Sequence, residues 1–541
     1  MSRHYDAIII GGGHNGLVCG FYLAKAGRRV LILEKRDIVG GAAVTEEFHP
    51  GFRNSVASYS VSLLNPKIIA DMELARHRLK VLIRPADYFA PSPDGKHLFM
   101  TRDERENIET IRKLSPKDAK AYPLYHERLD KLVDLFRSTL LETPPNAGGG
   151  VRDMFSAAML AKRAHKLGLE GQRDLIDLFG KSAGDILDNW FELDSIKGIL
   201  GFDAITGAYC SPYTPGSAYV LLHHVFGEAN GIQGAWGHAV GGMGAITQAM
   251  AAAVKDAGGE IRTDAPVREV IIENDRAQGV VLDDGTPIRA RVVASNIHPQ
   301  LLYGKLIPES ALPEEFAERI GHWRSGSGVF RMNVALSELP NFTARPSSGV
   351  ELHHQASIMI APSLEYLDTA YTDARRTGWA KKPVIEMHIP STIDNSLAPE
   401  GQHVASLFCQ QFAPELPNGE SWEDHRDDVA DLIIDTVNDY APNFKASVIG
   451  RMALSPLDLE RKLSLVGGDI FHGQLGLDQL FSARPVLGYA DYRGPFKGLY
   501  MCGSSTHPGG GVTGLPGHNA AREILRDIGK GRGGQMRAAA L

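Results

Sequence analysis

The sequence predicts an α/β fold that begins with a Rossmann-type βαβ unit, and two observations carry this prediction. An apolar run at residues 7–10 ends in Gly11-Gly-Gly-His-Asn-Gly16, and a helical pattern follows through Lys25. A second apolar run at residues 30–33 ends at Glu34, roughly 20 residues past Gly16, the usual distance for an acid that binds a ribose hydroxyl. Strand, glycine turn, helix and second strand thus follow in the order of a dinucleotide-binding unit.

Each glycine of this turn has a physical role. Gly11 permits the tight turn, Gly13 lets the backbone approach a pyrophosphate, and Gly16 lets helix and strand pack closely. The free N–H groups and the dipole at the helix start attract phosphate charge. A lone motif would be weak evidence, because 58 of 541 residues are glycine, but this one has its full context. The dinucleotide-binding residues predicted here are Gly11, Gly13, His14, Asn15, Gly16 and Glu34.

Composition excludes several classes of protein. The net charge of −7 gives no reason to expect nucleic acid as a partner. Four cysteines without a C-x-x-C pair argue against a disulfide framework, a zinc site and a redox dithiol, and we expect no metal. Because the first strand begins at Tyr5, we expect no signal peptide and a cytoplasmic location. The uncharged run at 204–227 contains prolines and histidines, so we expect protein interior rather than a membrane span.

The Gly40-Gly41 pair, which follows Glu34 closely, separates this sequence from an ordinary NAD fingerprint. Here the sequence resembles the flavoprotein group that includes phytoene desaturases and monoamine oxidases, in which such a pair contacts the FAD pyrophosphate. An arginine usually flanks the pair in that group, whereas this chain has Val39 and Ala42. The departure leaves phosphate neutralisation to backbone N–H groups and the helix dipole. Residues 42–66 are most similar to the pyridine nucleotide-disulphide oxidoreductase domain-containing protein 2 branch of phytoene desaturase-like proteins.

A glycine-rich run near the C-terminus extends the resemblance. Residues 498–503 read as a strand, followed by Thr506-His-Pro-Gly-Gly-Gly511 and a helix at 518–525, and phytoene desaturases have a similar run. The resemblance implies FAD bound without a covalent link, because Cys502 lies beside the pyrophosphate rather than the flavin ring. Besides the residues of the first motif, the resemblance implies these FAD contacts: Lys35, Gly40, Gly41, Ala42, Val267, Gly503, Gly511 and Val512.

The resemblance implies a two-dinucleotide-binding flavoprotein fold in two parts. The FAD-binding domain would comprise 1–75, 236–300 and 486–541, and an inserted α+β substrate domain would comprise 76–235 and 301–485. Hydrophobic strands at 328–335 and 383–389 predict a sheet floor for the substrate domain. Gly241-Gly242 is not a second fingerprint, since no strand leads into it and no acid follows about 20 residues later. We therefore expect NADH and NADPH to be poor reductants.

The insertion contains several elements with clear sequence signals. Residues 80–84 and 97–100 read as a strand pair, and Ser115-Pro116 opens a helix with a kink at Pro123. Residues 151–166 read as a helix with an apolar front and a basic rear, which favours either peripheral contact with an anionic membrane or a solvated domain cap. The apolar face predicted for the first helix comprises Leu124, Leu129, Leu132, Val133, Phe136 and Leu140.

Candidate substrate and catalytic residues are fewer. Residues 206–219 are small, aromatic and nearly uncharged, which suits an apolar pocket wall or a plain core, and Gly216 and Ala218 would limit the length of a bound chain. We place Tyr59, Tyr219 and His223 on the pocket, and we expect His223 and His224 on opposite faces of a strand, unable to share a metal. By resemblance His507 lies beside the flavin as an acid–base residue, or it merely anchors the Pro508 turn.

Three functions remain open at this stage. The first is an FAD-dependent dehydrogenase or desaturase that removes hydrogen from an apolar substrate such as a polyene or isoprenoid, with oxygen or a quinone as electron acceptor. The second is an amine oxidase-like flavoenzyme, although no tryptophan–tyrosine pair of the family type flanks the C-terminal glycines. The third is a flavoprotein that keeps FAD for stability and acts through protein contacts. The sequence does not indicate an oligomeric state.

Overall fold

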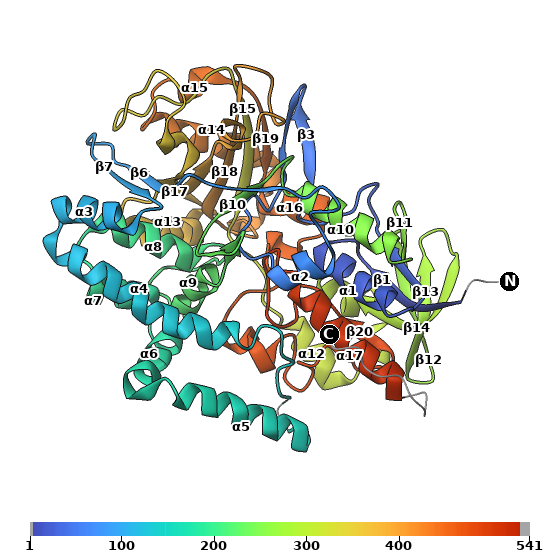
Figure 1. Cartoon of the computed structure of the whole chain (residues 1–541). Helices are drawn as coiled ribbons and strands as arrows, with labels where there is room; N and C mark the ends of the chain where they lie inside the picture. Colours follow the sequence, from blue (N-terminus) through green and yellow to red (C-terminus); the bar gives the residue numbers. More distant parts are fainter. Residues whose placement is uncertain (1–3, 147, 531–541) are drawn as a thin grey trace.

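The computed structural model describes residues 4–146 and 148–530. Both ends of the chain meet in one sheet, where the blue ribbons of β1 and α1 lie beside the red ribbons of β20 and α17 (Figure 1). A second sheet, coloured mostly yellow to orange, lies above it in that view, and a block of cyan and green helices flanks both. The predicted α/β architecture is confirmed.

The first sheet has seven strands in the order β11-β2-β1-β14-β13-β12, with β20 also paired to β14. β1 lies between β2 and β14 and is parallel to both, so the side chains of Ile8 and Ile9 are fully buried. Helices α1, α10 and α17 pack against this sheet. Its strands are β1 (Tyr5–Ile10), β2 (Val30–Leu33), β11 (Glu260–Arg262), β12 (Val267–Glu273), β13 (Arg276–Leu282), β14 (Pro287–Ser295) and β20 (Leu499–Met501), and its helices are α1 (His14–Lys25), α10 (Gly244–Asp256) and α17 (Leu515–Lys530).

The second sheet also has seven strands, in the order β19-β15-β18-β17-β16-β6-β7. The two strands predicted as its floor are β15 and β17, which confirms that expectation. The sheet contains strands from both segments assigned to the substrate domain, 76–235 and 301–485. The domain boundaries themselves stay a prediction. The strands are β6 (Ala86–Pro91), β7 (His97–Thr101), β15 (Phe330–Leu336), β16 (Ser357–Ile360), β17 (Trp379–His388), β18 (His403–Phe412) and β19 (Val448–Leu454), packed by α13 (Leu364–Thr377) and α14 (Trp422–Asn438).

The helical block confirms the predicted helix start at Ser115, whose side chain accepts a hydrogen bond from the Asp118 backbone N–H. Leu124 was wrongly placed on the buried face, since it is 55% exposed. It lies five positions before Leu129, about 140° around the helix. The block comprises α3 (Glu104–Leu114), α4 (Pro116–Arg137), α5 (Val151–His165), α6 (Gly168–Gly180), α7 (Ala183–Trp190), α8 (Asp194–Ile205) and α9 (Ser217–Val225).

Two further expectations are wrong. The strands at 81–83 (β5, Val81–Ile83) and 97–101 (β7) do not pair with each other, because β5 pairs with β10 (Gly237–Ala239) and β7 pairs with β6. His223 and His224 lie on the helix α9 rather than on a strand.

In the described part of the chain, no group of three or more histidine, cysteine or acidic side chains is arranged to hold a metal ion. Nor does any described helix have the length and apolar character needed to cross a bilayer.

Shorter elements complete the described chain. β3 and β4 form a hairpin, and α2 begins at Pro66 with Asn65 capping it. Their bounds are β3 (Thr45–His49), β4 (Phe52–Ser55), α2 (Pro66–Asp71), β8 (Glu228–Ala229), β9 (Ile232–Gln233), α11 (Pro299–Leu301), α12 (Glu314–Gly321), α15 (Phe444–Ser447) and α16 (Pro456–Leu463).

Candidate functional site

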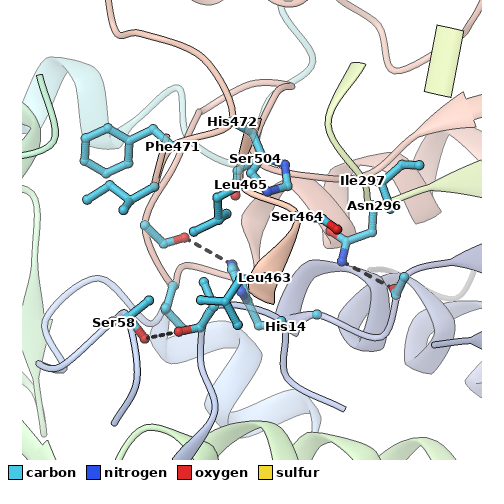
Figure 2. Close-up of a pocket in the computed structure, with 18 of the residues that line it drawn as sticks. His14, Ser58, Asn296, Ile297, Leu463, Ser464, Leu465, Phe471, His472 and Ser504 are labelled. Atoms are coloured by element: carbon cyan, nitrogen blue, oxygen red, sulfur yellow. Dashed lines mark hydrogen bonds between the residues drawn. The ribbon is translucent and has the colours of Figure 1, made fainter. Parts of the chain in front are cut away.

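A cavity of about 350 Å³ lies at the carboxyl end of β1 and extends to the second sheet. Its two ends differ: one is formed by the glycine turns and charged residues of the first sheet, and the other by apolar side chains. Figure 2 shows residues from several distant segments, including His14, Asn296, Leu463 and Phe471, facing this space. The predicted residues that line it are Gly11, Gly13, His14, Glu34, Lys35, Gly41, Ala42, Tyr59, Val267, Gly511 and Val512.

The first glycine turn leaves the start of α1 open to the cavity. Gly13 is the N-cap of α1, and Gly11 has a φ of +94°, which favours glycine. A Cβ on Gly16 would lie 2.2 Å from the Gly11 carbonyl oxygen, and one on Gly13 would lie 2.7 Å from Asn296 Nδ2. Asn15 and Gly16 support the turn from behind the lining, since Asn15 Nδ2 donates to Ser504 Oγ at 3.2 Å.

The Glu34 carboxylate lies where β2 ends and is held by the backbone. Oε2 accepts from the Gly12 N–H at 2.8 Å, and Oε1 accepts from the Arg36 N–H at 3.0 Å. Both contacts fix the carboxylate at the cavity edge beside Val267, as expected of an acid that binds a ribose.

The Gly40-Gly41 pair lies against the first turn. The Gly40 N–H donates to the Gly12 carbonyl at 2.9 Å, and a Cβ on Gly41 would lie 3.4 Å from the Gly13 Cα. Gly40 itself lies behind the lining, while Gly41 and Ala42 face the cavity. The chain has no arginine flanking the pair, but three cations line the cavity: Lys35, Arg36 and Lys305.

The C-terminal glycine run meets the start of α1 at the cavity. Gly511 and Val512 line it, and the Gly511 carbonyl lies 3.1 Å from His14 Nε2, the contact drawn at His14 in Figure 2. Gly503 lies behind Ser504, where a Cβ would meet the Asn296 carbonyl at 2.8 Å. Burial lowers the pKa of His14 to about 4, against the opposing effect of the Gly511 carbonyl, so its ring is neutral near pH 7.

His507 does not line this cavity. Its Nε2 lies 3.1 Å from the Thr139 carbonyl, and its ring packs edge-on against Phe481. Burial lowers the pKa of His507 to about 4. These contacts fit the anchoring role that the sequence left open, and they do not bring the ring to the space where a substrate would react.

Of the three residues assigned to the substrate pocket, only Tyr59 lines the cavity. Tyr219 instead packs against Phe136 and Phe179, and His223 packs against Phe226 and Phe471. Successive side chains of the helix α9 point in different directions, so His224 reaches the cavity and His223 does not.

The two residues proposed to limit chain length also lie elsewhere. Ala218 lines a separate small cavity between α4 and α6, and Gly216 has a φ of +86° at the start of α9. The apolar end of the main cavity is built from other side chains, namely Val61, Leu63, Phe408, Ile470 and Phe471.

His472 and Phe471, which were not among the predicted site residues, line the cavity from a loop. Arg484 holds this loop: its buried guanidinium donates to the carbonyls of Phe471 at 2.9 Å and Ser504 at 2.8 Å. Burial, followed by the charges of His14 and Arg484, lowers the pKa of His472 to about 4. No local motif marks these residues, but a proline-flanked arginine before the last strand was a visible signal.

Tyr59 connects the cavity to a buried polar network. Its hydroxyl donates to the Glu386 carboxylate, which also accepts from Ser357 Oγ and lies 3.0 Å from His388 Nε2. Arg84 Nη1 donates to the same His388 nitrogen at 2.7 Å. Although burial raises the pKa of Glu386, the charges of His388 and Arg84 and the hydrogen bonds lower it to about 2.

Comparison with known proteins identifies the family. Residues 16–334 match the sequence model of the family described as flavin containing amine oxidoreductase. The chain is also 42% identical to pyridine nucleotide-disulfide oxidoreductase domain-containing protein 2 of Rattus norvegicus, over 98% of this chain and 94% of that protein. The chain belongs to the flavin-containing amine oxidoreductase family. It is accordingly an FAD-dependent oxidoreductase.

Two further proteins similar to this chain support the resemblance seen in its sequence. Phytoene desaturase (lycopene-forming) of Pantoea ananas is 25% identical, with 96% of this chain and 99% of that protein covered. The solved structure of cyclohexylamine oxidase from Brevibacterium oxydans has the same fold, with a TM-score of 0.57 and 16% identity over 97% of this chain and 100% of that one.

The cavity fits the FAD of this family. Side-chain-free backbone at Gly11, Gly13 and Gly41 leaves room at the start of α1, where the helix N–H groups suit a pyrophosphate. Glu34 provides carboxylate oxygens for a ribose hydroxyl. The residues that would hold FAD are therefore the predicted ones that line the cavity, with Asn296 and Ser504 added, while Asn15, Gly16, Gly40 and Gly503 support them from behind.

Proposed function

We propose that this flavoprotein is a dehydrogenase that removes hydrogen from carbon in a largely apolar substrate. One observation carries the proposal: the cavity lined by the FAD-binding glycines continues without a break to Phe408 and Phe471. A substrate at that apolar end would lie against the flavin end of the same space. FAD supplies a ring that accepts a hydride when a C–H bond is held against it.

The residues of the chain itself would bind and orient the substrate and keep water away from it. Tyr59 and Phe408 form a wall with ring centroids 5.2 Å apart. Leu463, Leu465 and Phe471 also line the cavity and would exclude water (Figure 2). Burial of apolar substrate surface would contribute about 25 cal/mol per Å².

Anaerobic bleaching of the bound flavin tests the proposal. The holoenzyme would be mixed with polyenes, retinoids, fatty acyl compounds and amines, and the loss of visible absorbance recorded. We expect bleaching by at least one apolar compound, with recovery on adding oxygen or a quinone. Bleaching by amines alone would contradict the proposal.

One observation favours an amine oxidase-like activity as the second candidate. Three carboxyl groups, Asp87, Asp203 and Glu386, line a small side cavity next to the apolar end. Such groups could pair with an ammonium ion, and the fold is shared with cyclohexylamine oxidase. The amine arm of the bleaching experiment separates the two candidates.

A further inference from the structure

A side cavity of about 20 Å³ opens beside the apolar end of the main cavity. Four residues line both spaces: Tyr59, Thr206, His224 and Trp236. The volume holds roughly one water-sized group, because a cavity needs at least about 10–15 Å³ to hold a water. Only a single polar atom of a substrate could therefore enter it.

The side cavity is lined by more charged and polar side chains than the apolar end of the main cavity, although Ala86, Phe202 and Trp236 also line it. Arg84 and Ser357 are 7% and 3% exposed, and both point into the hydrogen-bonded network of Glu386 and His388. Burying such groups costs free energy unless each is paired. Most of this network is paired within itself, so it can offer little to a strongly charged ligand.

Asp203 is the exception. Its carboxyl group lines the side cavity from α8 and has no hydrogen-bond or ion-pair partner among residues 4–146 and 148–530. Asp203 is half-buried, and a half-buried carboxyl without a partner is a group that a ligand could satisfy. Burial, and then the negative charge of Glu386, raise the pKa of Asp203 to about 8, so near neutral pH it can donate a hydrogen bond.

We propose that the side cavity is a subsite for one uncharged oxygen of the substrate, an alcohol or a carbonyl, and that Asp203 binds this oxygen. The proposal rests on the proposed function and narrows its substrate class. The substrate is then an apolar molecule with an oxygen-bearing end, placed so that the adjoining carbon chain lies along Tyr59 and Phe408 in the main cavity.

The charges around the subsite favour an uncharged group over either ion. An ammonium ion would meet the Arg84 guanidinium, which lines the side cavity, and the uncharged carboxyl of Asp203 would leave its charge unpaired there. A carboxylate would meet Glu386, whose oxygens already accept from Tyr59 and Ser357. A neutral oxygen is repelled by neither kind of charge and can accept a hydrogen bond from the Asp203 carboxyl.

Matched probe compounds test the subsite. Dissociation constants for the holoenzyme would be measured by anaerobic calorimetry with geraniol, geranial, geranylamine and the parent hydrocarbon of the same carbon skeleton. We expect geraniol or geranial to bind at least about tenfold more tightly than the hydrocarbon, as one net hydrogen bond to a buried group would give. Asp203→Leu should abolish that preference, and Asp203→Asn, which keeps an amide donor, should retain part of it.

Asp194→Leu is the matched control, because Asp194 lies on the same helix with a side chain 68% exposed. It should leave the preference unchanged, and FAD content would verify folding of all variants. Equal binding of hydrocarbon and alcohol, tightest binding of the amine, or an unchanged preference in Asp203→Leu would overturn the subsite. If the hydrocarbon binds equally and bleaches the flavin, only the subsite fails. If none of the four compounds binds, the proposed function on apolar substrates fails with it.

Discussion

Tyr59 donates a hydrogen bond to Glu386, a residue 327 positions later in the chain, and this contact ties the first sheet region to β17 of the second sheet. The same tyrosine lines the main cavity, and its ring is tilted by 36° against that of Phe408. The wall of the substrate end is therefore held by a buried carboxylate rather than by packing alone.

Replacing Tyr59 tests that contact. Tyr59→Phe keeps the ring but leaves the Glu386 carboxylate with one hydrogen bond fewer, which should lower the free energy of unfolding by about 1–3 kcal/mol. Thermal unfolding of the holoenzyme would measure the loss. Tyr213→Phe, which removes a hydrogen bond to Asp188 at the surface, should cost much less. Equal losses in the two variants would show that the buried contact adds nothing.

Glu34 should determine FAD affinity. Glu34→Ala removes a charge-assisted acceptor at the ribose end, worth roughly 1.5–3 kcal/mol, so FAD should bind about 10–150-fold more weakly. Titration of apoprotein with FAD, followed by flavin fluorescence, gives the dissociation constant. Glu47→Ala, on the exposed side of β3, serves as the control. An unchanged dissociation constant in Glu34→Ala would contradict the assignment.

Asp203 should make stability depend on pH. Its pKa is raised to about 8 in the folded protein, so folding binds a proton at pH values between that pKa and the unfolded value near 4. Stability from this group is full below pH 4 and is lost as pH rises to 8, by up to about 1.4 kcal/mol per pH unit. The groups facing it are Glu386, Arg84, Asp87, Tyr88 and His224.

The comparison of Asp203→Asn with the unmodified protein isolates this effect, since the other groups titrate in both. Melting temperatures would be recorded from pH 5 to pH 8. The melting temperature of Asp203→Asn should rise relative to that of the unmodified protein as the pH increases. A constant difference across this range would mean that Asp203 is already ionised.

Helix α5 has an unusual exposure that suits a lipid surface. None of its residues is buried, and Val151, Met154 and Phe155 are 84%, 69% and 66% exposed. Its last turn is basic, and the helix projects from the body at the lower edge of Figure 1. We propose that α5 rests on an anionic membrane surface, with its apolar side chains entering the interface.

Vesicle flotation tests this contact. The protein should float with vesicles rich in phosphatidylserine and not with phosphatidylcholine vesicles, and the double variant Met154→Asp/Phe155→Asp should stay behind. Leu124→Asp, an exposed leucine of α4, is the control. Flotation of the double variant to the same extent would rule out α5 as the contact.

The FAD end of the site was predictable because its physics is local. Gly11, Gly13 and Gly41 are needed where a backbone turn, a helix start and a phosphate meet, and their spacing is fixed within a short stretch. The substrate end, apart from Tyr59, was not predictable. Glu386 and Arg84 come from strands far apart in the chain, and no spacing in the sequence shows that they meet.

Secondary-structure errors also had physical causes. The strand β6 was overlooked, although the Pro93-Asp94-Gly95 turn after it signals a hairpin that pairs β6 with β7. α9 reads as an apolar strand, and packing among α4, α7 and α8 selects the helix instead. That difference moved His224 into the cavity in place of His223.

We propose that one cavity holds FAD at its glycine end and an apolar substrate at its Phe408 end. Phe408→Ala and Phe412→Ala test it most directly, because both phenylalanines lie buried on β18 but only Phe408 lines the cavity. Each variant should lose about 3–5 kcal/mol of stability. For whichever apolar compound bleaches the flavin, anaerobic stopped-flow should show at least a tenfold slower bleaching in Phe408→Ala, with FAD content unchanged and Phe412→Ala unaffected. Equal bleaching rates in the two variants, or loss of FAD from Phe408→Ala alone, would contradict the account.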